Sequence, residues 1–176
     1  MNFRTLLKLK GLLNVRIDLP FRKPTRLKGY DYSTPGAYFV TVCTHGRQEL
    51  LSEIVGEDAH ILPQPKLTEI GNVCDKYINN INIKYENVTV DKYIIMPNHI
   101  HMIIFLHGRM WASSPTKNLN NIIGSFKTMV TKEIGNSIWQ RSYHDHVIRD
   151  EKDYQRIWEY IDTNAAKWED DCFYNG

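Results

Sequence analysis

Residues 96–106, MPNHIHMIIFL, constrain the fold most, because two histidines interrupt an otherwise almost wholly apolar run. Isoleucine and phenylalanine favour a β-strand, and Pro97 with Asn98 is typical of a tight turn just before one. Alternate side chains of a strand share a face, so His99 and His101 are expected to point the same way. Two parallel imidazoles on a rigid strand make half of a metal site.

The composition is that of an ordinary globular protein. With 176 residues, 42% of them apolar and 24% charged, the chain is expected to form one domain with a real core. Its apolar runs are far shorter than the roughly 20 residues that span a bilayer, and charges interrupt the N-terminal apolar patch. Three widely spaced cysteines favour a reducing cytoplasm and argue against a CxxC zinc site.

The charge is distributed unevenly along the chain. Residues 1–28 hold eight Lys or Arg and one acid, a net charge of +7, whereas the remainder has a net charge of −5. We therefore divide the chain into a basic arm, residues 1–28, and a single catalytic-type domain, residues 29–176. Such an arm often contacts nucleic acid, which makes Arg22, Lys23 and Arg26 candidate DNA contacts; a solvated leader is the alternative.

The hydrophobic periodicity predicts an alternating order of strands and helices. Helical spacing covers residues 67–80, 118–134 and 151–168, and strand patterns cover 37–45, 86–96, 99–106 and, weakly, 138–148. Residues 46–66 read as a loop because of Pro63 and Pro65. The order β-α-β-β-α-β-α predicts an α+β, ferredoxin-like (RRM-like) sandwich, whose central antiparallel sheet carries the two histidines and has helices packed on it.

The last helix offers a nucleophile. Tyr160 and Asn164 are spaced i and i+4, so they are neighbours on the flank of the apolar stripe of this helix. A helix packed on the sheet could present both to a cleft beside His99 and His101. There a metal would act as a Lewis acid on a phosphodiester while the phenolic oxygen attacks phosphorus.

These residues match a known family. MPNHIHMII resembles the HUH motif (His, hydrophobic, His) of single-tyrosine transposases. The resemblance covers roughly residues 30–168, and its C-terminal part is similar to the branch of REP-associated tyrosine transposases. The segments that carry it are YDYSTPGAYFVTVCT (30–44), SFK (125–127), Trp139-Gln140, His146-x-Ile148-Arg149 and Tyr160-Ile-x-x-Asn164.

The resemblance implies an activity and its parts. His99 and His101 would bind Mg²⁺ or Mn²⁺, Tyr160 would be the nucleophile, and Asn164 would complete the metal shell. The family cuts single-stranded DNA near imperfect hairpins, leaving a 5′-phosphotyrosine and a free 3′-hydroxyl for strand transfer. The implied partner is single-stranded or hairpin DNA, and the implied location is the cytoplasm, in association with the nucleoid.

The family pattern leaves open the oligomeric state and the position at which the last helix ends. Relatives differ in whether the tyrosine helix serves its own subunit or a partner's, so both a monomer and a homodimer fit the sequence. The branch usually continues Asn-Pro-x-Lys, whereas this chain has Asn164-Ala165-Ala166-Lys167. Without the proline, the helix is expected to run about one turn further, which would shift Asn164.

Other interpretations fit part of the pattern. A bare His-x-His is common, and the chain has a second one, of which His144 is expected at the surface, while His146 matches a family element without a known role. Lys127 and Arg149 are candidate DNA contacts, with solvated helix charges as the alternative. Two rival functions remain open: a nucleic-acid-binding module that no longer cuts, and a metallohydrolase that uses an activated water.

Overall fold

The computed structural model describes residues 27, 29–56, 62–108 and 118–174. The candidate DNA contacts Arg22, Lys23 and Arg26 lie outside the described residues, as does nearly all of the predicted basic arm. Among the described helices, none has the length and apolar character needed to cross a membrane.

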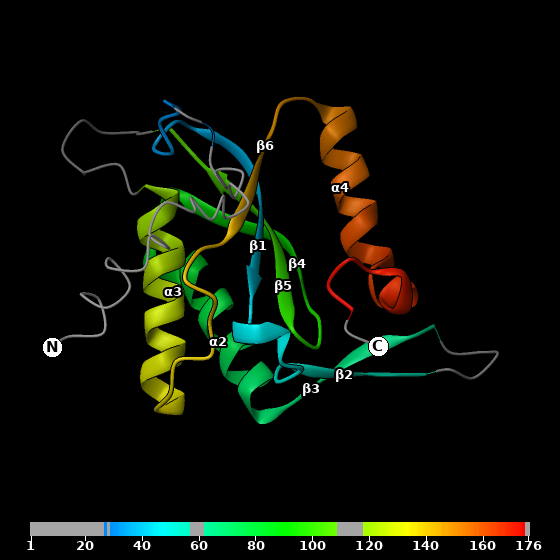
Figure 1. The fold of residues 1–176 in the computed structure, drawn as a ribbon. Helices are drawn as coiled ribbons and strands as arrows, with labels where there is room; N and C mark the ends of the chain where they lie inside the picture. Colours follow the sequence, from blue (N-terminus) through cyan, green and yellow to red (C-terminus); the bar gives the residue numbers. More distant parts are fainter. Residues whose placement is uncertain (1–26, 28, 57–61, 109–117, 175–176) are drawn as a thin grey trace, which may run out of the picture.

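A four-stranded antiparallel sheet forms the centre of the domain (Figure 1). Its strand order is β4-β5-β1-β6, so β5 and β1 are the inner strands. Pro97 and Asn98 join β4 to β5 in a tight hairpin, in which Met96 N–H donates to the His99 carbonyl (2.9 Å). The strands are β1 (Gly36–Cys43), β4 (Val88–Ile95), β5 (His99–Leu106) and β6 (His144–Ile148).

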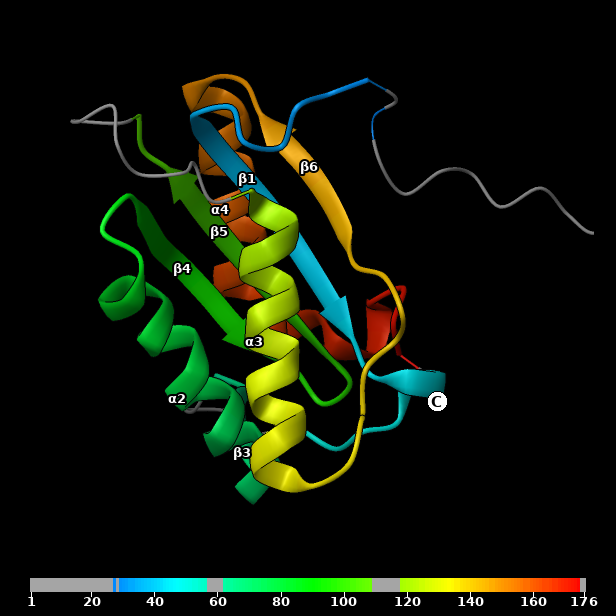
Figure 2. The same cartoon turned by 90° about the vertical axis from the view of Figure 1, so that its left-hand side faces the viewer.

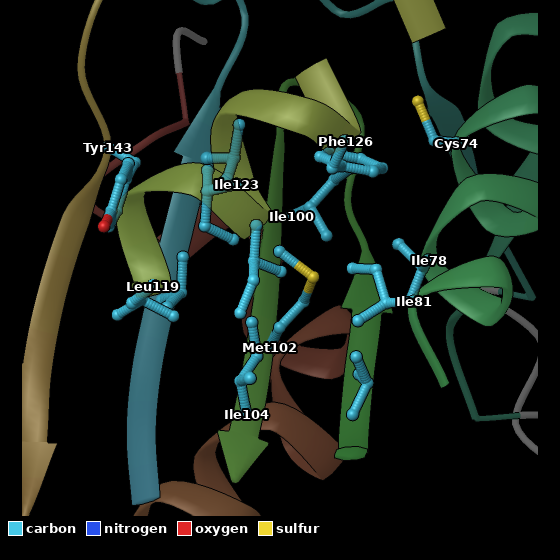
Figure 3. Packing of buried hydrophobic residues seen from close by; sticks show 14 of the residues in the cluster. Cys74, Ile78, Ile81, Ile100, Met102, Ile104, Leu119, Ile123, Phe126 and Tyr143 are labelled. Carbon is cyan, nitrogen blue, oxygen red and sulfur yellow. The ribbon is translucent and has the colours of Figure 1, made fainter. Parts of the chain in front are cut away.

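Two helices, α2 (Glu69–Lys84) and α3 (Leu119–Ile134), cover one face of the sheet (Figure 2). Figure 3 shows the core between them, in which every second residue of β5 points toward the two helices. These β5 residues are fully buried: Ile100, Met102 and Ile104. Burial of such side chains stabilises the fold by about 1.5–3 kcal/mol each.

The third helix, α4 (Glu151–Thr163), lies on the opposite face of the sheet (Figure 1). Asp150 is the N-cap of this helix, because its carboxylate accepts from Asp153 N–H (2.8 Å) in the first turn. Ile157 and Ile161 pack against Ile103 of β5. Because helices cover β5 on both faces, its side chains are apolar on both faces too, apart from the two histidines. The predicted α+β sandwich is therefore confirmed.

The expectation of a loop over residues 46–66 was wrong in part. This segment contains a separate hairpin of two short strands, β2 (Ser52–Val55) and β3 (Gln64–Leu67), with Ile54 opposite Pro65. Proline is tolerated because a strand in a two-stranded ribbon has one side that needs no N–H donors. Pro65 therefore marks an edge position rather than a loop.

The end of the last helix also differs from the expectation. The helix predicted over 151–168 ends at Thr163, and a 3₁₀ segment, η3 (Ala165–Asp170), follows Asn164 with a kink at Lys167. The absence of proline after Asn164 therefore does not prolong the helix. The change of chain direction at η3 brings residues 171–173 back toward β5, where Phe173 lies against His99.

We predict that Gly71→Ala destabilises the protein by at least about 2 kcal/mol, measured as the free energy of unfolding in urea. A Cβ on Gly71 would lie 2.0 Å from the carbonyl oxygen of Leu51, a rigid backbone atom. Leu51 N–H in turn donates to the Pro97 carbonyl (2.9 Å), so the strain reaches the turn before His99.

Gly124→Ala is the matched control. Gly124 also lies in a helix, but nothing stands within 4 Å of its Cβ position, so this change should stabilise the protein by about 0.5–1 kcal/mol. Equal stability of the two variants would show that α2 does not approach Leu51 this closely.

Candidate metal and tyrosine site

The structure brings Tyr160 together with the histidine pair of its own chain. His99 and His101 begin β5, are 0% and 1% exposed, and face α4 rather than the main core. The Tyr160 hydroxyl lies 3.2 Å from His101 Nε2 and closes this side of the site, while 39% of the residue remains exposed. Tyr160 and His101 of one and the same chain are therefore in contact.

Asn98 fixes the protonation of His99. Asn98 Nδ2 donates to the Phe173 carbonyl (2.8 Å) and to the Arg47 carbonyl (3.3 Å), which orients the amide. Its oxygen then accepts from His99 Nδ1–H at 2.9 Å. His99 Nε2 is therefore left with its lone pair directed into the site, which is the form of histidine that binds a metal.

His101 is held in a similar way by the neighbouring strand. Its Nδ1 lies 2.8 Å from Thr41 Oγ1 on β1, and its ring stacks on Phe39 with 5.1 Å between ring centroids. Burial lowers the pKa of both His99 and His101 below the ordinary value for histidine. Both imidazoles are thus neutral at neutral pH and can act as ligands.

Asn164, at the end of α4, also reaches the site. It is 1% exposed, and its Nδ2 donates to Asp171 Oδ2 at 2.8 Å. Within the described part of the chain, Asn164 Oδ1 and His99 Nε2 are buried and have no hydrogen-bond partner. Buried polar atoms are nearly always satisfied, so two such atoms at one site fit the binding of a ligand there.

Asp171 completes the constellation, and the sequence analysis did not identify it. One ligand atom from each of His99, His101 and Asp171 lies within 4.8 Å of the other two. The Tyr160 hydroxyl donates to Asp171 Oδ2 at 3.2 Å. Asp171 belongs to no periodic element, and the acidic run Glu169-Asp170-Asp171, a few residues after the tyrosine helix, is the signal that could have indicated it.

Contacts from the rest of the chain hold the Asp171 segment in place. Arg47 Nη1 donates to the Cys172 carbonyl (2.9 Å), and its guanidinium lies 5.4 Å from the centroid of the Phe173 ring. The centroid of the Phe173 ring lies in turn 4.6 Å from the centroid of the His99 ring. Arg47 has a φ of +56°, a strained conformation that proteins retain mainly where function requires it.

Tyr160 is protonated in this environment. Burial is the main cause that raises the pKa of its hydroxyl above the ordinary value, and the negative charge of Asp171 raises it further. The phenol therefore keeps its proton at neutral pH and directs it to the Asp171 carboxylate. A proton acceptor thus stands next to the candidate nucleophile.

The residues present fit a divalent cation. Two neutral imidazoles, a carboxylate and an amide oxygen form a mixed nitrogen and oxygen donor set. Such a set suits first-row divalent metals better than it suits metals that prefer thiolate ligands. The unpaired His99 Nε2 and Asn164 Oδ1 would both gain a partner. The donor atoms come from a buried strand, a helix end and the segment that follows it.

The other candidate residues lie away from this cluster. Lys127 Nζ donates to the Gln140 carbonyl (2.5 Å), which gives it a structural role in the loop before β6. Arg149 is exposed between β6 and α4, His144 is exposed on β6 as expected, and His146 bonds Asp153.

Comparisons with known proteins agree with this architecture. The chain matches no protein-family model. Over 173 residues it is 34% identical to an uncharacterized protein of Haemophilus influenzae, and the alignment covers 87% of this chain and 93% of the relative. The chain belongs to the same family as this Haemophilus protein.

Among solved structures, the chain is similar to a REP-associated tyrosine transposase bound to a REP hairpin. The TM-score is 0.59 at 21% identity, and the match covers 81% of this chain and 73% of the transposase. The chain therefore has the fold of the REP-associated tyrosine transposase, and the resemblance seen in the sequence is confirmed at the level of the fold.

We predict that Mn²⁺ raises the melting temperature of the protein, because a ligand that binds only the folded state stabilises it. At a free concentration about 100 times the dissociation constant, the gain is about 2.7 kcal/mol. Asp171→Asn should lose most of this gain in a calorimetric melt. Asp170→Asn, which removes the adjacent exposed carboxylate, should keep it. Equal gains for both variants would exclude Asp171 as a ligand.

Proposed function

We propose that this protein is a metal-dependent, single-stranded DNA endonuclease and strand transferase of the tyrosine HUH transposase type. The observation that carries the proposal is the contact of Tyr160 with His101 at a site where His99 Nε2 and Asn164 Oδ1 are buried without partners. The fold shared with a hairpin-bound transposase supports DNA as the substrate.

The side chains take distinct roles in this proposal. His99 and His101 hold Mg²⁺ or Mn²⁺ together with Asp171, and Asn164 adds its amide oxygen. When bound, the cation supplies Lewis-acid polarisation of the scissile phosphate and offsets the negative charge of Asp171. Thr41 and Asn98 keep the two imidazoles in the orientation that leaves Nε2 available.

Tyr160 provides the nucleophile. Its oxygen forms the new bond to phosphorus while the bond from phosphorus to the 3′-oxygen breaks. The phenolic proton passes to Asp171, and the departing 3′-oxygen takes up a proton from water. The product is a 5′-phosphotyrosine and a free 3′-hydroxyl. A later attack by a 3′-hydroxyl reverses these steps and rejoins a strand, which hydrolysis by water would not permit.

The partner in this proposal is a single strand that carries a hairpin, in the nucleoid of the cytoplasm. The sequence candidates Arg149, Arg22, Lys23 and Arg26 would neutralise phosphates outside the cleavage site. Because Tyr160 meets the histidines of its own chain, a monomer is sufficient for cutting.

We predict that wild-type protein forms a covalent adduct with a labelled hairpin-bearing strand taken from the flanks of its own gene, in the presence of Mn²⁺. Tyr160→Phe should abolish this adduct on a denaturing protein gel. Tyr154→Phe is the matched control on the same helix, since its hydroxyl bonds Asp91 (2.6 Å) away from the histidines, and should retain the adduct.

The rival functions give different results in the same experiment. Metal-dependent cutting that survives Tyr160→Phe without an adduct would identify a hydrolase that uses an activated water. Wild-type protein that binds the strand but never cuts it would identify a binding module. Either result would overturn the proposed tyrosine chemistry.

A further inference from the structure

A cleft beside Tyr160 extends from the site, whose His101 is among its lining residues. It has a volume of about 450 Å³, and we call it the β1–β6 cleft. It lies where α4, which packs mainly over β4 and β5, covers the β1–β6 half of this sheet face less completely. The residues that matter for its chemistry are Phe39, His101, His146, Arg156 and Tyr160.

The floor of the cleft is an aromatic ring in direct contact with the reactive groups. Phe39 is half-buried on β1, stacks on His101, and meets the Tyr160 ring edge-on at 6.1 Å between centroids. The part of this ring that lines the cleft is an apolar surface next to the reactive groups. Such surfaces bind nucleic-acid bases by stacking, with little preference for sequence.

The wall of the cleft holds one cation that can bind a phosphate, Arg156, and its position is linked to that of His146 through Asp153. Asp153 accepts from Arg156 Nη2 at 2.6 Å through one oxygen, and its other oxygen lies 2.7 Å from His146 Nε2. These contacts, that of Arg156 above all, lower the pKa of Asp153 to about 2, so its charge is maintained. Asp153 thus orients Arg156 and His146. Its pairing with them reduces the negative charge of the carboxylate that an incoming phosphate would meet.

Arg156 retains most of its binding capacity. Its side chain is 70% exposed, and its bond to Asp153 uses only part of the five N–H donors of a guanidinium. His146 stands opposite Phe39 in the pairing of β6 with β1, so its position on the cleft wall is set by the register of the sheet. Phe39, which can stack on a base, and Arg156, which can bind a phosphate, therefore line the same cleft.

We propose that the β1–β6 cleft binds a nucleotide adjacent to the phosphate attacked by Tyr160, with its base on Phe39 and its phosphate at Arg156, which Asp153, itself held by His146, positions. This proposal rests on the proposed function, since it assumes that a single strand reaches Tyr160. It gives a role to His146, which the sequence pattern marked and the cleavage chemistry does not use.

The test measures the affinity of the full-length protein for a fluorescein-labelled oligothymidylate by anisotropy, in EDTA and at several salt concentrations. Arg156→Gln should weaken binding about tenfold and lower the slope of log affinity against log salt by about 0.7, the value of one phosphate contact on a single strand. Phe39→Leu should also weaken binding about tenfold but leave the slope unchanged.

Lys132→Gln is the matched control, because Lys132 is an exposed cation on α3, on the opposite face of the sheet. It should leave both affinity and slope unchanged. Arg156 is largely exposed, so its replacement leaves the core intact and decides the question even if the Phe39 variant fails to fold. Wild-type affinity and slope in Arg156→Gln would overturn the proposal.

The covalent-adduct assay separates this proposal from the proposed function. If Arg156→Gln binds the strand normally while wild type forms the Tyr160 adduct, the cleft proposal fails and the function stands. If wild type forms no adduct but Arg156→Gln and Phe39→Leu lose affinity as described, the cleft proposal stands and the cutting chemistry fails.

Discussion

The site depends on one constraint, which is the burial of two imidazoles on an inner strand of the sheet. His99 and His101 lie where water cannot satisfy them, so each ring must find partners within the protein or in a bound ligand. Asn98 and Thr41 provide a partner for each Nδ1. The described residues leave His99 Nε2 without one, and this deficit makes a cation the natural occupant.

The end of α4 turns this histidine pair into a reactive site. Because the helix ends at Thr163, Asn164 can bury its amide and the chain can fold back to place Asp171 beside Tyr160. A continuous helix would have carried these residues away from β5. In the proposed function Asp171 takes two roles from this one position, as a ligand for the cation and as the acceptor of the tyrosine proton.

The sequence predicted those parts of the site that lie on regular elements. Period-two alternation placed His99 and His101 on one strand face, and helical spacing paired Tyr160 with Asn164 on one flank. It could not predict Asp171 or the supporting Arg47, because loop residues reach the site through the path of the chain and leave no periodic signal. The hairpin around Pro65 was missed for a related reason, since an edge strand tolerates a residue that usually indicates a loop.

The measurement that tests the central claim most directly is pulsed electron paramagnetic resonance on the protein loaded with Mn²⁺. If His99 and His101 both bind the metal, the echo modulation shows couplings to two imidazole nitrogens, and His99→Ala leaves one. Bound Mn²⁺ without nitrogen couplings would contradict the account, because the cation would then lie away from the buried histidines and from Tyr160.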